Sequence, residues 1–383
     1  MTTLAFRNAD ALIDGRLDRV DIVVDGGWIV EVGDAPVTGR VDTVDCAGLV
    51  IAPGYIDLQC NGAVGVDLTT EPDRVGEVGG ALPRFGVTAF LPTVITCPAA
   101  GRVAALAALG GSRPSIGDGA ALPLGLHLEG PALSPRRLGA HPPALVVGAD
   151  QLAPEVTDWV DSGCVAMVTL APELDGAMEL IEQLAAGGVT VAAGHTTMTP
   201  AVLAAAKRAG LRYVTHLFNA MEHFDHRAPG PVGATLADDD VVAGLICDGV
   251  HVDPVAVKMA WNALGPSRTS LVSDAVAALG EPYGTLRLGG VEVIHDETGV
   301  RLVDGTLAGS SLALDQAVRN LLSFTGCTLA DALATVTSVP SDVLGLTDRG
   351  RLEVGARADL VLLDHDANLL ATIIGGEVVH GRV

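Results

Sequence analysis

Eight short apolar runs constrain the fold of this 383-residue chain more than any other feature. Each run is followed by a polar or glycine-rich turn, and most are then followed by a helical pattern. Continuous apolar strands that alternate with helices are typical of a parallel sheet covered on its outside. Because eight such units close a barrel, we predict a (β/α)8 TIM-like barrel. Its strands are expected at Leu49 to Gln59, Val87 to Val94, Leu122 to Glu129, Val165 to Leu170, Val189 to His195, Arg212 to His216, Val242 to Asp248 and Thr269 to Asp274.

Helix start signals support this alternation. Thr199–Pro200 and Asp253–Pro254 each place a capping side chain before a first-turn proline. Thr328 with Asp331 resembles a capping box. The sequence therefore predicts helices that begin at these three places.

The two ends of the chain read differently from its middle. Residues 1–48 alternate apolar and polar residues around a glycine turn, and residues 350–383 repeat this pattern. Two short β segments at opposite termini are most economically one domain, so we expect a small β-sandwich built by both ends. The predicted domains are residues 1–50 and 350–383 for the sandwich and 51–349 for the barrel. A strand pair at about 285–306 is expected as an insertion after the eighth strand.

The net charge of −23 excludes some partners. Nucleic acid and anionic membranes would both demand a basic face, so neither is expected to bind. A small anionic substrate remains compatible, but it needs a local cationic or amide-lined pocket. Only Lys207 and Lys258 are lysines, so arginine must supply almost all of the positive charge.

The six cysteines are far apart and form no Cys-x-x-Cys pair, which argues against a disulfide framework and against a zinc ribbon. The N-terminal residues lack a charged segment followed by an apolar run, and no apolar stretch approaches the length that spans a bilayer. We therefore expect free thiols and a cytoplasmic protein.

Polar side chains close four of the eight runs. Glu129 ends the third, His195 the fifth, His216 the sixth and Asp274 the eighth. The carboxyl ends of barrel strands meet at one face, where the active site lies, so these residues are expected to converge. One carboxylate and two imidazoles form a normal ligand set for a catalytic divalent metal that keeps a position open for water. Asp274 is then expected beside that water as a proton acceptor.

The other histidines have less specific settings. His127 lies two residues before Glu129 and is expected deeper in the barrel, as a supporting or core residue. His141 and His251 lie in loops just beyond strand ends, where they could face a substrate. Four more histidines lie in polar surroundings and are expected to be loop or surface residues, namely His223, His226, His365 and His380.

Seven motifs, in this order, resemble the N-acetylglucosamine-6-phosphate deacetylases of the amidohydrolase superfamily. They are PGYIDLQCNG, GLHLEGP, AGHT, THLFNAM, ICDGVHVD, LVSDA and TLAGSSL. The resemblance spans nearly the whole chain, and THLFNAM together with GLHLEGP is its most specific part. It implies an amidohydrolase-type barrel with a small β-sandwich, and a homodimer.

The resemblance also implies roles for residues. Metal ligands are implied at Glu129, His195 and His216, and the catalytic acid and base at Asp274. His141 is implied near the scissile carbonyl, and Arg227 is implied to reach the substrate phosphate of the neighbouring subunit. Sugar-phosphate contacts are implied at Ala140, His141, Asn219, Ala220, Arg227, His251, Leu307, Ala308 and Gly309.

Gln59 and Asn61 bear on the number of metals. In many metal-dependent hydrolases built on barrels, these two slots carry His-x-His. A neutral amide is a poor ligand for a zinc-like ion compared with imidazole or carboxylate. We therefore predict one tightly held divalent ion per subunit, with zinc preferred, and expect the two amides to hydrogen-bond around it.

The expected reaction is hydrolysis of N-acetylglucosamine 6-phosphate to glucosamine 6-phosphate and acetate. Two other readings stay open. One is a different amidohydrolase, such as a D-aminoacylase or a cyclic-amide hydrolase, with the same metal and another pocket. The other is a non-catalytic sugar-phosphate sensor, against which Asp274 argues, because binding alone needs no general base.

Overall fold

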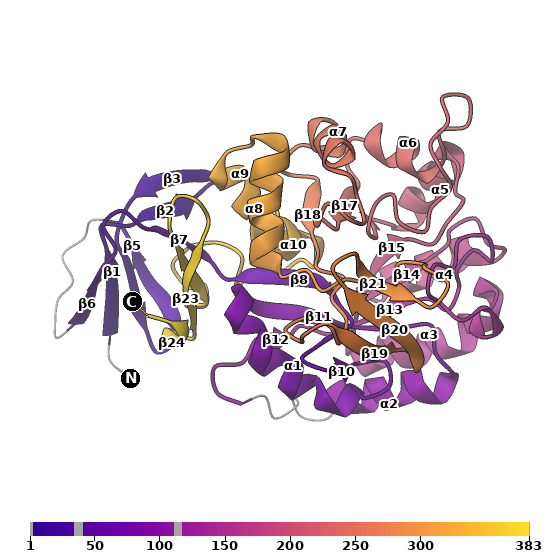
Figure 1. The fold of residues 1–383 in the computed structure, drawn as a ribbon, viewed down its shortest axis with the longest axis horizontal. Coiled ribbons are helices and arrows are strands. Elements are labelled where there is room, and N and C mark those ends of the chain that lie inside the picture. Colours follow the sequence, from indigo (N-terminus) through magenta and orange to yellow (C-terminus); the bar gives the residue numbers. More distant parts are fainter. Residues whose placement is uncertain (1–2, 34–40, 111–116, 383) are drawn as a thin grey trace.

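The structure is a computed structural model that describes residues 3–33, 41–110 and 117–382. Residues 1–2, 34–40, 111–116 and 383, which the expected domains include, lie outside the described residues. Figure 1 shows two units, a barrel with its helices and a smaller β unit where both termini lie.

The predicted (β/α)8 barrel is confirmed. Its eight parallel strands belong to a nine-stranded sheet in which each strand pairs with the next, while short β12 (Leu122–Pro123) lies outside against the second barrel strand. The last barrel strand returns toward the first through a bridge between Cys60 and Ala275, so the sheet is nearly closed. The barrel strands are β8 (Tyr55–Cys60), β11 (Val87–Ile95), β13 (Leu126–Glu129), β14 (Val165–Leu170), β15 (Thr190–Ala193), β16 (Tyr213–Val214), β17 (Val242–Leu245) and β18 (Thr269–Leu271).

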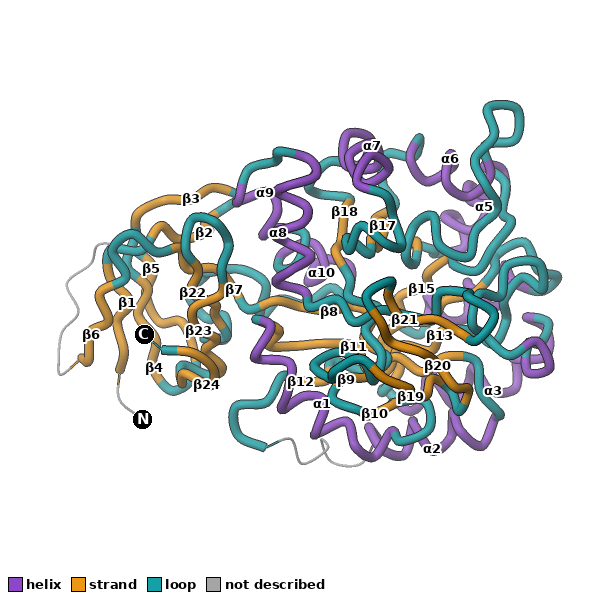
Figure 2. The backbone as a smooth tube through the Cα atoms, viewed as in Figure 1, coloured by secondary structure: helices purple, strands orange, loops and turns teal. Residues whose placement is uncertain are grey.

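Helices surround this sheet, as the purple segments around the orange strands of Figure 2 show. The three helix starts with capping signals are confirmed: the side chains of Thr199, Asp253 and Thr328 each accept a first-turn backbone N–H. The α-helices are α1 (Val75–Ala81), α2 (Ala99–Gly110), α3 (Ala153–Ser162), α4 (Ala177–Ala186), α5 (Pro200–Ala209), α6 (Gly230–Leu236), α7 (Pro254–Leu264), α8 (Leu314–Thr325), α9 (Leu329–Ala334) and α10 (Ser338–Val343). Short 3-10 turns occur at Pro72–Arg74, Leu82–Phe85, Pro143–Leu145 and Ala149–Leu152.

The first predicted strand is in fact two strands. Residues Val50–Pro53 form β7, which pairs in the terminal β unit, and the chain enters the barrel only with β8. Gly54 separates them, and a Cβ there would lie 2.2 Å from Oγ1 of Thr88. The chain thus passes from one unit to the other at a residue without a side chain. The division at residues 50 and 350 stays a prediction.

Both termini build the small β-sandwich. A four-stranded sheet has the order β5-β4-β1-β6 and a six-stranded sheet the order β24-β23-β22-β7-β2-β3. Buried apolar residues from both ends of the chain, among them Phe6, Ile22, Leu360 and Ile373, fill the core between them. The strands are β1 (Thr3–Arg7), β2 (Asp10–Ile13), β3 (Arg16–Arg19), β4 (Ile22–Asp25), β5 (Trp28–Val32), β6 (Val41–Asp45), β22 (Leu360–Leu363), β23 (Leu369–Ile374) and β24 (Glu377–Gly381).

The insertion after β18 has three strands, where a strand pair was predicted. β19 (Gly284–Leu288), β20 (Val291–Asp296) and β21 (Gly299–Leu302) form an antiparallel sheet. Its buried side packs Leu288, Val293 and Val300 onto Ile95 and Ala308. A separate short pair, β9 (Gly62–Ala63) and β10 (Val66–Asp67), follows β8. The insertion therefore forms one wall above the barrel mouth.

Candidate active site

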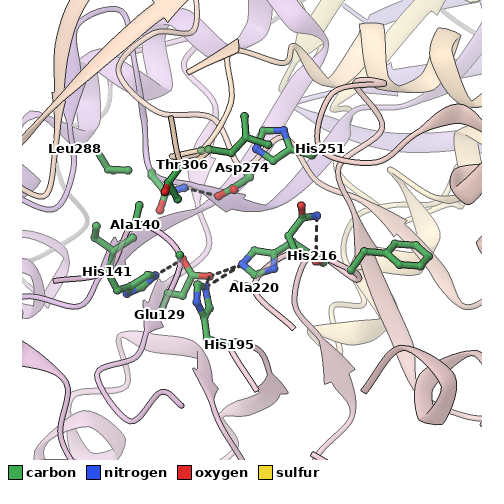
Figure 3. Close-up of a pocket in the computed structure, with 17 residues that line it drawn as sticks. Glu129, Ala140, His141, His195, His216, Ala220, His251, Asp274, Leu288 and Thr306 are labelled. Atoms are coloured by element: carbon green, nitrogen blue, oxygen red, sulfur yellow. Dashed lines mark hydrogen bonds and ion pairs between the residues drawn. The ribbon is translucent and has the colours of Figure 1, made fainter. Parts of the chain in front are cut away.

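Three buried side chains converge at the carboxyl ends of β13, β15 and β16, and Figure 3 shows them pointing toward one another. Oε1 of Glu129 lies 3.2 Å from Nε2 of His195 and 2.9 Å from Nε2 of His216. The two imidazole nitrogens are 3.2 Å apart. The convergence that the strand ends predict is therefore present in the fold.

The hydrogen bond of His195 leaves its Nε2 nitrogen free to bind a metal. Its Nδ1 lies 3.0 Å from the carbonyl oxygen of Arg137, which can only accept, so Nδ1 carries the proton. Nε2 then presents a lone pair toward Glu129. A metal-binding imidazole is commonly oriented by such a bond from its other nitrogen, so this donor set fits a divalent metal.

The electrostatics of the cluster favour a positive charge at its centre. Burial opposes ionisation of Glu129, but the close approach of the His195 and His216 imidazoles outweighs it and holds the pKa of Glu129 well below its usual value. Burial also opposes a charged His216, yet the neighbouring Glu129 carboxylate raises the pKa of His216. A buried carboxylate among neutral donors is costly without a cation. The site is therefore suited to hold one.

Backbone strain concentrates at this mouth. Glu129 is the last residue of β13, but His195, His216 and Asp274 lie beyond their strands with φ of 50°, 29° and 48°. Five of the nine non-glycine residues with positive φ in the described chain line the same cavity, including Phe218 and Ala220. Such conformations cost free energy and gather at functional sites. The predicted strands extend past the observed ones because the backbone turns here and strand pairing ends.

Asp274 lies beside the cluster and is held by both amides. Nδ2 of Asn61 donates to Oδ1 of Asp274 at 2.8 Å, and Nε2 of Gln59 donates to the same oxygen at 3.0 Å and to Glu129 at 3.2 Å. A carboxylate only accepts, so both amides present their nitrogens, and an NH₂ group offers no lone pair to a metal. Burial first, and then the charge of Glu129, raises the pKa of Asp274 to about 7.

His141 faces the cluster from the loop that follows β13. The backbone N–H of Thr96 donates to Nδ1 of His141 at 3.3 Å, so the proton of the neutral ring is on Nε2. Nε2 lies 3.8 Å from Oε2 of Glu129. Burial first, and then His195, lowers the pKa of His141 to about 3. Glu129, His141 and His195 also have the spacing of a metal group, but Nε2–H makes His141 a donor and His216 the better third ligand.

A cavity of about 280 Å³ opens beside these groups. Most implied substrate contacts line it, namely Ala140, His141, Asn219, Ala220, His251, Leu307 and Gly309. Ala308 does not line it, because its side chain is buried in the cluster beneath the three-stranded sheet. Residues that we did not predict also line it, namely Ile95, Gly139, Phe218, Leu288 and Thr306.

Arg227 is the implied contact that lies apart from this cavity. It is exposed, in a tight turn where Asp225 pairs with Ala228, within the loop that projects ahead of α6 in Figure 1. Its neighbours His223 and His226 are exposed as well, as predicted. The described fold of one chain therefore does not bring Arg227 to the cavity.

Three supporting side chains were absent from the sequence prediction. Oδ2 of Asp248 lies 2.6 Å from Nδ1 of His251 and orients that ring. Asp57 accepts bonds from Ser273 and joins the ends of β8 and β18. Thr96 directs His141, as described above. Their only sequence signal is that each is a polar residue within or just after a buried run.

His127 is buried deeper in the barrel, as predicted. Its two ring nitrogens lie 3.2 Å from Oγ1 of Thr93 and 2.8 Å from Oγ1 of Thr169. Burial is the main reason why the pKa of His127 is lowered to about 4. It is therefore a neutral residue that supports the barrel interior.

None of the helices within residues 3–33, 41–110 and 117–382 is both long enough and apolar enough to cross a bilayer.

Comparisons with known proteins agree with this geometry. Residues 50–379 match the Amidohydrolase family. The chain is 38% identical to the N-acetylglucosamine-6-phosphate deacetylase of Rattus norvegicus, with 98% of this chain and 95% of that protein covered. It is 36% identical to the enzyme of the same name from Bacillus subtilis (strain 168), with 87% of this chain and 85% of that protein covered.

Solved structures show the same likeness. The N-acetylglucosamine-6-phosphate deacetylase from Pasteurella multocida superposes with a TM-score of 0.91 at 29% identity, over 98% of this chain and 99% of that one. A mutant of the Mycobacterium smegmatis deacetylase, in complex with N-acetyl-D-glucosamine-6-phosphate, superposes with a TM-score of 0.88 at 33% identity, over 99% of both chains. The chain therefore belongs to the amidohydrolase family and, within it, to the N-acetylglucosamine-6-phosphate deacetylases.

Proposed function

We propose that this enzyme hydrolyses N-acetyl-D-glucosamine 6-phosphate to D-glucosamine 6-phosphate and acetate. The observation that carries the proposal is the cluster of Glu129, His195 and His216 with Asp274 beside it, in a chain so similar to the named deacetylases. The proposed role places the substrate in the cavity of about 280 Å³ that these residues line.

Glu129, His195 and His216 would hold one divalent metal, for which we propose zinc. Carboxylate and imidazole donors suit zinc, and three protein ligands leave a position open. When bound, such an ion lowers the pKa of a water molecule and withdraws electron density from a carbonyl oxygen. The second site is absent in this proposal because Gln59 and Asn61 direct amide nitrogens at Asp274.

Asp274 performs both proton transfers in the proposed mechanism. Its carboxylate accepts a proton from the attacking water, and the protonated carboxyl group then donates that proton to the departing amine nitrogen. A pKa raised to about 7 suits both steps, because the group can take and release a proton near neutral pH. Asn61 and Gln59 hold one oxygen of Asp274 in place while this happens.

His141 supplies a hydrogen bond to the acetamide oxygen. Its Nε2–H is directed into the cavity because Nδ1 is occupied by Thr96. A neutral, buried donor of this kind stabilises negative charge that develops on an oxygen, and it needs no reorganisation during the reaction. Ala140 lies next to it on the cavity wall.

The phosphate end is proposed to be shared between two subunits. Asn219 and His251 line the cavity of the same chain, whereas Arg227 is exposed. A guanidinium suits bidentate phosphate binding, so we propose a homodimer in which each Arg227 reaches the partner's cavity. A cytoplasmic location is also proposed, which six free cysteines favour.

An acetate-release assay tests the proposal. The purified protein is supplied with N-acetylglucosamine 6-phosphate, with unphosphorylated N-acetylglucosamine and with an N-acyl-D-amino acid. The proposed function requires rapid acetate release from the phosphorylated sugar. Faster turnover of another amide would point to a different amidohydrolase, and binding of the phosphorylated sugar without turnover would point to a sensor.

A further inference from the structure

The segment of residues 134–141, which follows β13, carries two functions of the site at once. The carbonyl of Arg137 accepts from Nδ1 of His195, and His141 at its end points Nε2 into the cavity. Its position therefore sets the orientation of one metal-binding imidazole and the place of one hydrogen-bond donor.

The carboxylate of Glu222 forms ion pairs with two arginines of this segment. Oε1 of Glu222 lies 2.5 Å from Nη2 of Arg137, and its Oε2 lies 2.9 Å from Nη2 of Arg136. Among the described residues, neither guanidinium pairs with another carboxylate. The Arg137 and Glu222 side chains are only 25% and 31% exposed, whereas Arg136 is 71% exposed. Arg137 therefore makes the better shielded of the two bonds.

Glu222 itself is anchored beside the cluster of Glu129, His195 and His216. Its backbone N–H donates to the carbonyl of Thr196 at 3.1 Å, and Met221 forms a bridge with Thr196. Thr196 is the residue after His195, so the carboxylate stands on backbone that is continuous with a metal-binding residue. Glu222 also begins the loop that carries Arg227.

We propose that Glu222 is a positioning residue for the reaction: it clamps the 134–141 segment over the site through Arg137 and Arg136. The inference rests on the proposed function. It predicts that the clamp acts on turnover through His141 and His195. The opposing possibility is an ordinary surface ion pair, which contributes little.

The test compares Glu222→Gln with Glu77→Gln. Glu77 is the control, because its carboxylate likewise accepts two bonds from guanidinium groups, in its case both from Arg74 at 2.9 and 2.8 Å, at an exposed position of α1 that does not line the cavity. Glu222→Gln should lower kcat about tenfold, in the range typical of coupled contacts, with KM for the phosphorylated sugar little changed. Glu77→Gln should leave kcat unchanged, and both variants should keep the melting temperature of the wild type.

Hydrogen exchange supplies a readout that is independent of activity. The backbone N–H groups of Ser134, Arg137 and His141 are hydrogen-bonded. They should exchange faster in Glu222→Gln and at the wild-type rate in Glu77→Gln. Unchanged exchange in the 134–141 segment would overturn the clamp. If the wild type releases no acetate, the proposed function fails, and the exchange rates still decide the clamp.

A double-mutant cycle tests whether Arg137 and Glu222 act through the same interaction. Arg137→Gln alone should reproduce the loss of kcat, and Arg137→Gln with Glu222→Gln should be no worse than either single variant, because both remove one interaction. Additive losses would mean that the two residues act separately, which would overturn the proposal.

Discussion

The mouth of the barrel and the projecting loop before α6 are built in opposite ways. Glu129, His195 and His216 are each less than 5% exposed and meet within 3.2 Å of one another inside one chain. Arg227 is exposed, and the described chain offers it no place in the cavity. In the proposed function, residues of one barrel therefore bind the acetamide end of the substrate, whereas Arg227 would reach the phosphate end from the partner subunit.

Removal of a proposed metal ligand at the barrel mouth should have the largest effect on activity. His216→Ala should lose the bound metal and nearly all activity together, whereas purified wild-type protein should carry one divalent ion per chain after dialysis. Elemental analysis and acetate release measure both. His365→Ala is the control, because His365 lies in the sandwich region, near Asp10. Two tightly bound ions per wild-type chain would contradict the reading of Gln59 and Asn61 as amide donors.

Asp274→Asn should separate chemistry from binding. The variant should retain metal and substrate and lose about 10²- to 10⁴-fold in kcat, the range for a positioned acid and base. Metal analysis and titration calorimetry with the phosphorylated sugar establish that binding survives. Turnover near the wild-type rate with metal in place would assign the proton transfers to another group.

Arg227→Ala tests the loop side. A charged hydrogen bond to phosphate is worth a few kcal/mol, so KM should rise about 10- to 100-fold with a smaller change in kcat. Arg208→Ala, at an exposed position of α5, should change neither.

A subunit-mixing experiment asks whether Arg227 acts across a dimer. Arg227→Ala subunits are exchanged with Asp274→Asn subunits and assayed at low substrate. A shared site regains one complete centre in the heterodimer, so activity returns. No recovery, with exchange verified separately, would place Arg227 in its own chain or outside the site.

A further effect concerns the stability of the metal-free protein. The pKa of Asp274 is raised by burial to about 7 in the folded state, against about 4 when unfolded. The unfolded chain therefore releases the proton first, and stability from this group is complete below about pH 4 and lost as pH rises toward 7. The loss is at most about 1.4 kcal/mol per pH unit. Urea unfolding at pH 5 and pH 7 should show it in wild type and not in Asp274→Asn.

The sequence was sufficient for the parts of the protein that depend on local pattern. The apolar runs predicted a parallel barrel, the caps at Thr199, Asp253 and Thr328 predicted three helix starts, and the strand-end rule selected Glu129, His195, His216 and Asp274. These inferences hold because burial and capping leave periodic marks in a chain. The strands were predicted too long at their carboxyl ends, because the turns with positive φ at His195, His216 and Asp274 leave no periodic pattern in the sequence.

Only the tertiary structure decided how groups far apart in the chain meet. It directed the nitrogens of Gln59 and Asn61 at Asp274, placed Thr96 behind His141, and set Leu288 of the three-stranded insertion in the cavity wall. It also left Arg227 outside the cavity of its own chain. The physical reason is that hydrogen-bond direction and exposure depend on neighbours brought together by the closed barrel, and residue order along the chain does not contain those distances.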